Sequence, residues 1–113
     1  MSSITRPEVY IAIGKKIKEY RLKNNLTQEQ LAEELNLSVK YVSRIENGIG
    51  GVKLETLTKA MNLLGMAPND AFSDLIDNED LKLKLLLFSK ISELSKDRID
   101  FLLSIIDSFK FLK

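Results

Sequence analysis

Lysine, arginine, carboxylate, serine and tyrosine side chains are left to do chemistry in this 113-residue chain, because it has no histidine and no cysteine. The missing histidine removes imidazole general bases and Ser-His-Asp triads. The missing cysteine removes thiolate nucleophiles, thiolate metal sites and disulfides. Asp97, Asp100 and Asp107 share no apolar cleft that the sequence indicates, and we expect them to face solvent. The sequence therefore predicts no enzyme, no cofactor and no metal site.

The most informative spacing lies in residues 27–48, TQEQLAEELNLSVKYVSRIENG. Lys40 and Arg44 are four positions apart and share one helix face, whereas Val42 and Ile45 fall on the opposite face. A short helix with a polar and basic outer face, held out by another helix, fits the width of a DNA major groove. Residues 1–65 carry ten Lys/Arg against seven Asp/Glu, and residues 66–113 carry seven against nine. This uneven charge hints at an anionic partner for the first half.

The apolar residues are spaced as in α-helices. Most apolar residues recur three or four positions apart, and only two prolines and five glycines interrupt the chain. This pattern predicts an all-α protein. The expected helices span residues 7–24, 27–35, 38–46, 54–64 and 68–76, followed by residues 79–94 and 96–112.

Polar residues at the expected helix ends support these boundaries. Thr27 and Gln30 have the spacing of a capping box, and Ser38 can cap the next helix. Asn36 suits the left-handed conformation of a tight turn, and Gly65 can end the fourth helix. A junction at residues 77–78 would separate a five-helix unit from a two-helix tail.

Residues 27–48 resemble the helix-turn-helix of the Cro and phage-repressor type, also called the XRE family. The resemblance covers roughly residues 13–72. The matching residues are Gln28, Leu31, Ala32, Leu37, Ser38, Val42, Ser43, Ile45, Glu46, Asn47 and Gly48. It implies a lambda-repressor-like, five-helix DNA-binding domain at residues 1–77, in a sequence-specific transcriptional regulator whose partner is double-stranded DNA. Asn25 and Asn36 depart from the glycines common in the family, and Lys53 replaces its usual polar N-cap.

The resemblance also implies roles for single residues. Base contacts are expected from Val39, Lys40, Ser43 and Arg44. Arg44 or Lys40 would bond guanine O6 and N7, and Val39 would meet a thymine methyl. Phosphate contacts are expected from Gln28, Ser38, Tyr41, Asn47 and Lys53. Arg21 is expected to pair with Glu46 as a structural contact. Solvated charges remain an alternative for Lys40 and Arg44, and packing on the second helix remains one for Tyr41.

The tail, residues 78–113, predicts a C-terminal helical dimerisation segment. Its last helix carries two neighbouring apolar stripes. One is Ile99, Leu102, Leu103, Ile106 and Phe109, and the other is Phe101, Ile105 and Leu112. Together they are wider than the roughly 100° that covers one small domain. We expect burial against the preceding helix and against a second subunit; the alternative is packing within one chain against the five-helix unit.

These features together predict a homodimeric repressor on a near-palindromic operator, with recognition helices roughly 34 Å apart. The alternative is an antitoxin or protein-interaction module whose tail binds a different protein. A protein or peptide antirepressor is a further partner to consider. The longest apolar run, residues 85–88, is too short to span a bilayer, and the tail's mixed Asp and Lys do not favour a membrane surface. We expect a cytoplasmic protein.

Overall fold

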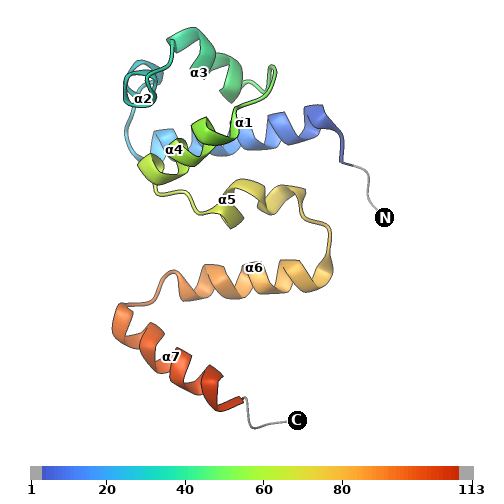
Figure 1. The fold of residues 1–113 in the computed structure, drawn as a ribbon, viewed down its shortest axis with the longest axis vertical. Helices are drawn as coiled ribbons and strands as arrows, with labels where there is room; N and C mark the ends of the chain where they lie inside the picture. The colour runs from blue at the N-terminus through green and yellow to red at the C-terminus, as the bar shows by residue number, and fades with distance from the viewer. Residues whose placement is uncertain (1–3, 110–113) are drawn as a thin grey trace. The chain divides into compact units, whose positions relative to one another are not determined.

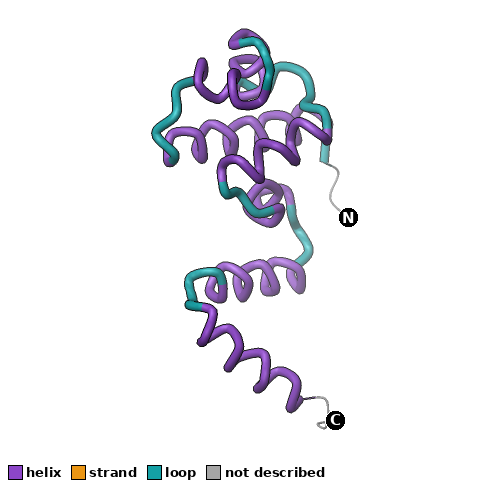
Figure 2. The backbone as a smooth tube through the Cα atoms, turned by 60° about the vertical axis from the view of Figure 1, so that its left-hand side comes forward, coloured by secondary structure: helices purple, strands orange, loops and turns teal. Residues whose placement is uncertain are grey.

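The computed structural model describes residues 4–109, which form helices and loops without a strand (Figures 1 and 2). This confirms the all-α prediction. The helices are α1 (Arg6–Lys23), α2 (Gln28–Leu35), α3 (Val39–Glu46), α4 (Leu54–Leu64), α5 (Pro68–Phe72), the 3-10 helix η1 (Ser73–Leu75), α6 (Glu79–Ile91) and α7 (Lys96–Ser108). The chain divides into two compact units: the N-terminal unit, residues 1–77, and the C-terminal unit, residues 78–113.

Side-chain caps set the starts of the first helices, because the first amides of a helix lack partners within it. Thr5 accepts the Glu8 amide at the start of α1. Thr27 and Gln30 form a complete capping box at α2: the Gln30 amide donates to Thr27 Oγ1 at 3.0 Å, and Gln30 Oε1 accepts the Thr27 amide at 2.8 Å. Local sequence alone therefore fixes where α2 begins.

The core of the N-terminal unit lies where α1 meets α3, α4 and α5 and where α2 meets α3 and α4. Leu31 is fully buried and Val42 nearly so. The remaining apolar members are Ile13, Ile17, Ala32, Leu35, Ile45, Leu57, Ala60, Leu64, Met66 and Ala71. These side chains come from all five helices and, for Met66, from the turn between α4 and α5, so the orientation of α3 depends on the whole unit.

Gly14 lets α1 approach α3 at backbone distance. It is buried in the middle of α1, and a Cβ there would collide with the backbone carbonyl oxygen of Ile45. A glycine inside a helix costs about 1 kcal/mol relative to alanine, so its presence points to packing. The close contact fixes the depth at which α3 sits on α1.

Several expected boundaries were wrong by a few residues. The fifth helix was expected to include Ile76, but α5 ends at Phe72, and Ile76 is extended after η1. The sixth was expected to reach residue 94 and ends at Ile91. Ser73 Oγ donates to the Asp70 carbonyl near the first of these ends, and Ser92 Oγ donates to the Ser89 carbonyl at 2.8 Å near the second. Ser104 makes the same kind of bond to Phe101 inside α7, so such a bond does not by itself end a helix.

The C-terminal unit consists of α6 and α7, joined by residues 92–95, and none of its described residues is buried. Asn78 caps α6 by accepting the Leu81 amide at 2.9 Å. Ser95 stands at the N-cap position of α7, but its side chain makes no cap hydrogen bond. The expected end of α7 at residue 112, and with it Leu112, lies outside the described residues.

Candidate nucleic-acid interface

A rigid turn joins α2 to α3. Asn36 adopts the left-handed conformation at φ 56°, which asparagine tolerates better than most residues. The Leu37 amide returns to the Ala32 carbonyl at 2.8 Å, and the Leu37 side chain packs against the core. Ser38 Oγ then accepts the Tyr41 amide at 3.1 Å. The turn therefore leaves little freedom in the angle between the two helices.

The two faces of α3 have opposite chemistry. Val42, Ile45 and Glu46 are buried, at 1%, 7% and 6% exposure. The other face carries Val39, Lys40 and Arg44, which are exposed, and Ser43, which is half-buried. Positions 39, 40, 43 and 44 lie within one stripe of an α-helix. The structure thus brings all four expected base-contacting residues together on one accessible surface.

A buried network connects this surface to α1. Arg21 Nε donates to Glu46 Oε2 at 2.7 Å, Arg21 Nη2 donates to Glu46 Oε1 at 3.0 Å, and Arg21 Nη1 donates to the Leu26 carbonyl at 2.8 Å. The first two bonds form a bidentate pair, which fixes geometry more strictly than a point charge does. Side-chain exposure is 8% for Arg21 and 1% for Glu46, so water competes little for this pair.

Gln28 has a contact that sequence reasoning missed. Its Nε2 donates to Glu46 Oε1 at 3.1 Å, so Gln28 at the start of α2 joins the Arg21–Glu46 pair. A primary amide has two N–H donors. The bond to Glu46 therefore leaves donor capacity for a phosphate, the role that the resemblance implies. The sequence signal was the position of Gln28, one residue after the Thr27 cap.

The other expected phosphate contacts occupy varied surroundings. Ser38 and Asn47 are exposed, and Asn47 Nδ2 donates to Ser43 Oγ at 3.3 Å. Tyr41 is half-buried and packs against the core. The N-termini of α2 and α3 add unpaired amides, which favour anions.

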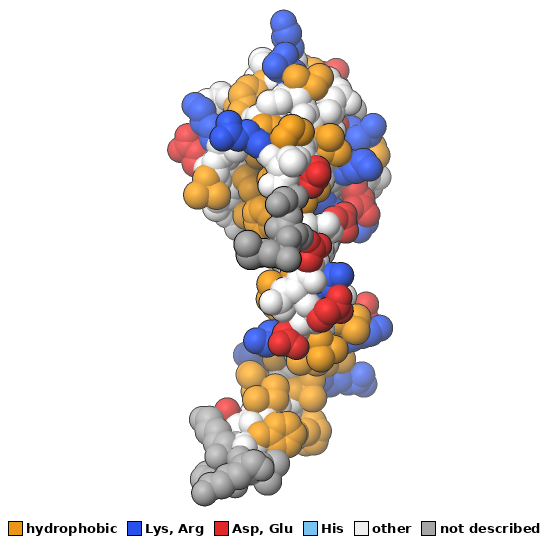
Figure 3. Space-filling view, turned by 90° about the vertical axis from the view of Figure 1, so that its right-hand side faces the viewer, with side chains coloured by type: hydrophobic (Ala, Val, Ile, Leu, Met, Phe, Trp, Pro, Cys, Tyr) orange, Lys and Arg blue, Asp and Glu red, His pale blue; other side chains and the backbone are white. Residues whose placement is uncertain are grey.

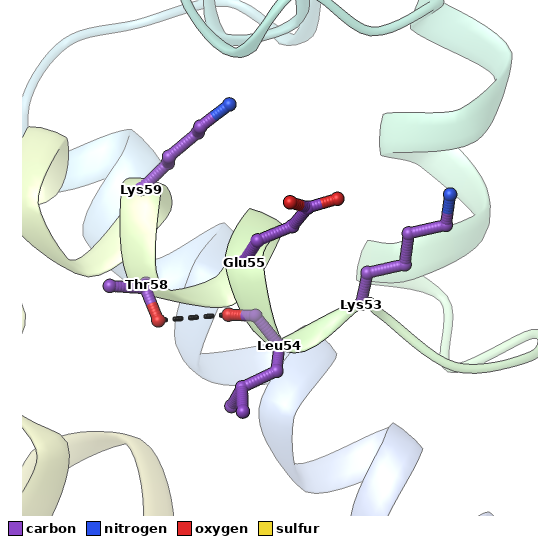
Figure 4. Close-up of a pocket in the computed structure, with 5 residues that line it drawn as sticks. All are labelled: Lys53, Leu54, Glu55, Thr58 and Lys59. Carbon is purple, nitrogen blue, oxygen red and sulfur yellow. Dashed lines mark hydrogen bonds between the residues drawn. The ribbon is translucent and has the colours of Figure 1, made fainter.

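Lys53 lies at the start of α4, where no side chain caps the helix. Figure 4 shows Lys53 and Lys59 on either side of Glu55, with Thr58 Oγ1 donating to the Leu54 carbonyl at 2.8 Å. Because a carboxylate stands between the two lysines, this surface is not uniformly basic. Lys53 itself is exposed and open to solvent contacts.

Among residues 4–109 there is neither a metal-binding cluster nor a membrane-spanning helix. No group of three or more acidic side chains in this range has the arrangement of a metal site. No helix in the range is long and apolar enough to cross a membrane. The exposed face of α3 remains the principal candidate site.

Comparison with known proteins assigns this architecture to a family. The helix-turn-helix family profile matches residues 17–70. Control protein C.BamHI of Bacillus amyloliquefaciens is 38% identical over 63 residues, which are 55% of this chain and 78% of that protein. Control protein C.MunI of Mycoplasma sp is 38% identical over 69 residues, or 60% of this chain and 93% of that protein.

A solved structure supports the same assignment. The crystal structure of the clp gene regulator ClgR from C. glutamicum aligns with a TM-score of 0.53 and 28% sequence identity, over 56% of this chain and 81% of that one. The chain belongs to the helix-turn-helix family of the Cro and phage-repressor type. It is a DNA-binding transcriptional regulator, and its family is not a family of enzymes.

Proposed function

We propose that the chain is a homodimeric repressor that binds a near-palindromic operator through α3. The observation that carries the proposal is the division of α3: one face is buried through Val42 and Ile45, and the opposite face exposes Lys40 and Arg44. A helix held in this way can enter the major groove without rearrangement. The dimer would block polymerase by occupying promoter DNA.

In this proposal the exposed residues of α3 read bases. Arg44 has a planar guanidinium that can bond guanine O6 and N7 together, and Lys40 can reach the same acceptors as a point charge. Val39, 39% exposed, supplies a methyl surface for thymine. Ser43 is half-buried and has the least reach of the four.

The proposed phosphate contacts surround this base-reading stripe. Gln28 and Ser38 lie at the N-termini of α2 and α3, where backbone amides add to their donors. Tyr41, Asn47 and Lys53 extend the set on α3 and toward α4. Such contacts position the protein on the duplex but carry no sequence information directly.

The homodimer is proposed from the C-terminal unit. Leu103, Ile106 and Phe109 of the expected interface are exposed at 52%, 47% and 55%, and Ile99 and Leu102 are half-buried. Figure 3 shows hydrophobic side chains gathered over the helices of this unit. Apolar surface of this kind marks an interaction site, and a two-fold dimer would pair two copies of α3 for a two-fold DNA site.

Selection of bound sites from random double-stranded DNA tests the proposal. We expect two inverted half-sites, about 10 base pairs apart from centre to centre. A protein that enriches no sequence would contradict base reading by α3. Enrichment of a single unrepeated half-site would contradict the dimer while keeping the base contacts.

Two alanine substitutions separate base reading from backbone binding. Arg44→Ala should weaken binding to the selected site by about 1–3 kcal/mol and leave binding to random DNA nearly unchanged. Lys53→Ala, the matched loss of one positive charge, should lower affinity on all sequences and flatten the salt dependence slightly. Equal losses on both kinds of DNA after Arg44→Ala would show that Arg44 binds only backbone.

The same exposed tail supports a second candidate function, an antitoxin or interaction module. In that case α6 and α7 bind a different protein, such as a toxin or an antirepressor, in place of a second copy. The purified chain would then sediment as a monomer. It would form a defined complex with the other protein, and deletion of residues 78–113 would abolish that complex. A stable dimer of the purified chain favours the repressor.

A further inference from the structure

The loop between α3 and α4 is held against α1 at two glycines. Gly48 has the left-handed conformation at φ 71°, and a Cβ there would come within 2.8 Å of the Ile11 side chain. A Cβ at Gly51 would come within 2.9 Å of the Tyr10 ring. Glycine permits such close approach because it has no side chain. The loop backbone is therefore fixed on α1 on both sides of Ile49.

Ile49 is a large apolar residue that this loop leaves 52% exposed. Its amide donates to the Arg44 carbonyl at 2.9 Å, and the Gly48 amide donates to the Ile45 carbonyl at 3.0 Å. These two bonds form the Schellman motif that ends a helix. The motif frequently brings an apolar residue after the glycine against the side chain five positions earlier. In this chain that earlier side chain is Arg44, one of the proposed base contacts.

Arg44 and Ile49 line the same pocket at the end of α3. The pocket has a volume of about 130 Å³ and also includes Tyr41 and Ile45 in its lining. An arginine packs its hydrocarbon stem along apolar surface while the guanidinium stays in water. Among residues 4–109 no carboxylate forms an ion pair with Arg44. The apolar surface of Ile49 is therefore what can restrict the direction of the Arg44 stem.

A restricted arginine has an advantage when it reads a base. A guanidinium that bonds guanine O6 and N7 together must adopt one direction. The loss of freedom of one long side chain costs roughly two- to tenfold in affinity, and pre-organisation of that side chain reduces the cost. The advantage concerns only the complex in which Arg44 is fixed on a base, so it should raise sequence preference and leave affinity for random DNA unchanged.

We propose that Ile49 is a positioning residue for base reading. Its side chain supports the stem of Arg44 and directs the guanidinium outward from α3 to a guanine edge. The inference rests on the proposed base contact of Arg44. It adds a residue outside α3 to those that determine sequence preference, and it gives the close contacts of Gly48 and Gly51 with α1 a role in holding that residue in place.

A double-mutant cycle of Ile49 and Arg44 tests the proposal. One duplex carries the sequence that the wild-type chain enriches from random DNA. The second has adenine in place of the guanine at which Arg44→Ala loses its preference. The ratio of the two dissociation constants measures the preference for guanine. Ile49→Ala should lower this ratio roughly two- to tenfold, and in the Arg44→Ala background it should have no effect, because no guanidinium remains to be directed.

Two further variants control for a merely structural effect. Ile49→Ala keeps the amide that bonds the Arg44 carbonyl, and Ile49→Leu keeps the apolar volume and should restore most of the preference. Leu22→Ala, at a position of α1 that is 55% exposed, should leave the preference unchanged. An unchanged preference after Ile49→Ala, or an equal loss with and without Arg44, overturns the positioning role. If Arg44→Ala itself alters no base preference, the proposed base reading fails and this inference fails with it.

Discussion

The N-terminal and C-terminal units are both built from helices rich in apolar residues, but the first unit buries these residues and the second does not. In the first, twelve apolar residues are buried and the Arg21–Glu46 pair is satisfied inside. In the second, α6 and α7 are equally rich in leucine, isoleucine and phenylalanine, yet no described residue is buried. An amphipathic helix gains stability only from a surface that covers its apolar side. The first unit supplies that surface itself, whereas the described residues of α6 and α7 leave their apolar sides uncovered.

In the proposed function, this difference separates two tasks. DNA reading requires α3 to be held at one angle, and the closed core around Leu31 and Val42 provides it. Assembly requires apolar surface that stays available. The effects of substitutions in the two units should therefore differ in kind as well as in size.

The largest expected effect is the loss of Glu46. Glu46→Ala leaves Arg21 charged and buried without its partner, which typically costs about 3–5 kcal/mol. Urea unfolding measures the loss. Glu34→Ala, at an exposed position of α2, is the control and should change stability by about 0.5 kcal/mol or less. Equal effects of the two substitutions would show that the buried network does not stabilise the first unit.

A matched pair of leucine truncations tests the comparison directly. Leu31→Ala creates a cavity at a fully buried position and should cost about 2–5 kcal/mol at any protein concentration. Leu86→Ala removes a side chain that is 55% exposed. Because it weakens the proposed assembly, its effect on stability should be largest at high protein concentration and shrink as the protein is diluted below its dissociation constant. Unfolding curves at two concentrations distinguish them. Concentration-independent loss for both would mean that the second unit has a core of its own.

Gly14→Ala tests the contact between α1 and α3. Helix propensity alone would favour alanine by about 1 kcal/mol, but the new Cβ meets the Ile45 carbonyl. Overpacking of this kind should leave a net loss of about 1–3 kcal/mol. Lys15→Ala, at the exposed neighbouring position, serves as the control. A stabilised Gly14→Ala protein would show that α1 and α3 can separate without cost.

The smallest expected effect concerns Tyr20 on α1. Burial, and then the Asp70 carboxylate beside it, raise the pKa of the Tyr20 hydroxyl above its ordinary value of 10.0. The folded state then holds the proton more tightly than the unfolded state. This contribution to stability is present below pH 10 and is lost as pH rises through the folded-state pKa. Tyr20→Phe should therefore flatten the alkaline fall in unfolding free energy, and an unchanged slope would exclude Tyr20 as a cause.

Local chemistry made much of the first unit predictable. The capping box of Thr27 and Gln30 and the turn at Asn36 depend on neighbours within four residues. The inward side of α3 follows from a helical period that needs no other information. By contrast, α5 and α6 end earlier than expected, at Phe72 and Ile91. Serine occurs next to both of these ends and also inside α7, so the sequence pattern alone did not locate the ends.

The sequence by itself determined the helices, the class of fold and which face of α3 is polar, because caps and periodicity act over a few residues. Only the tertiary structure decided that Gln28 joins the Arg21–Glu46 pair, that Gly14 brings α1 onto α3, and that the tail helices stay apart. These features join positions distant in the chain or depend on relative helix placement. Their energies come from packing and burial, which no local pattern specifies.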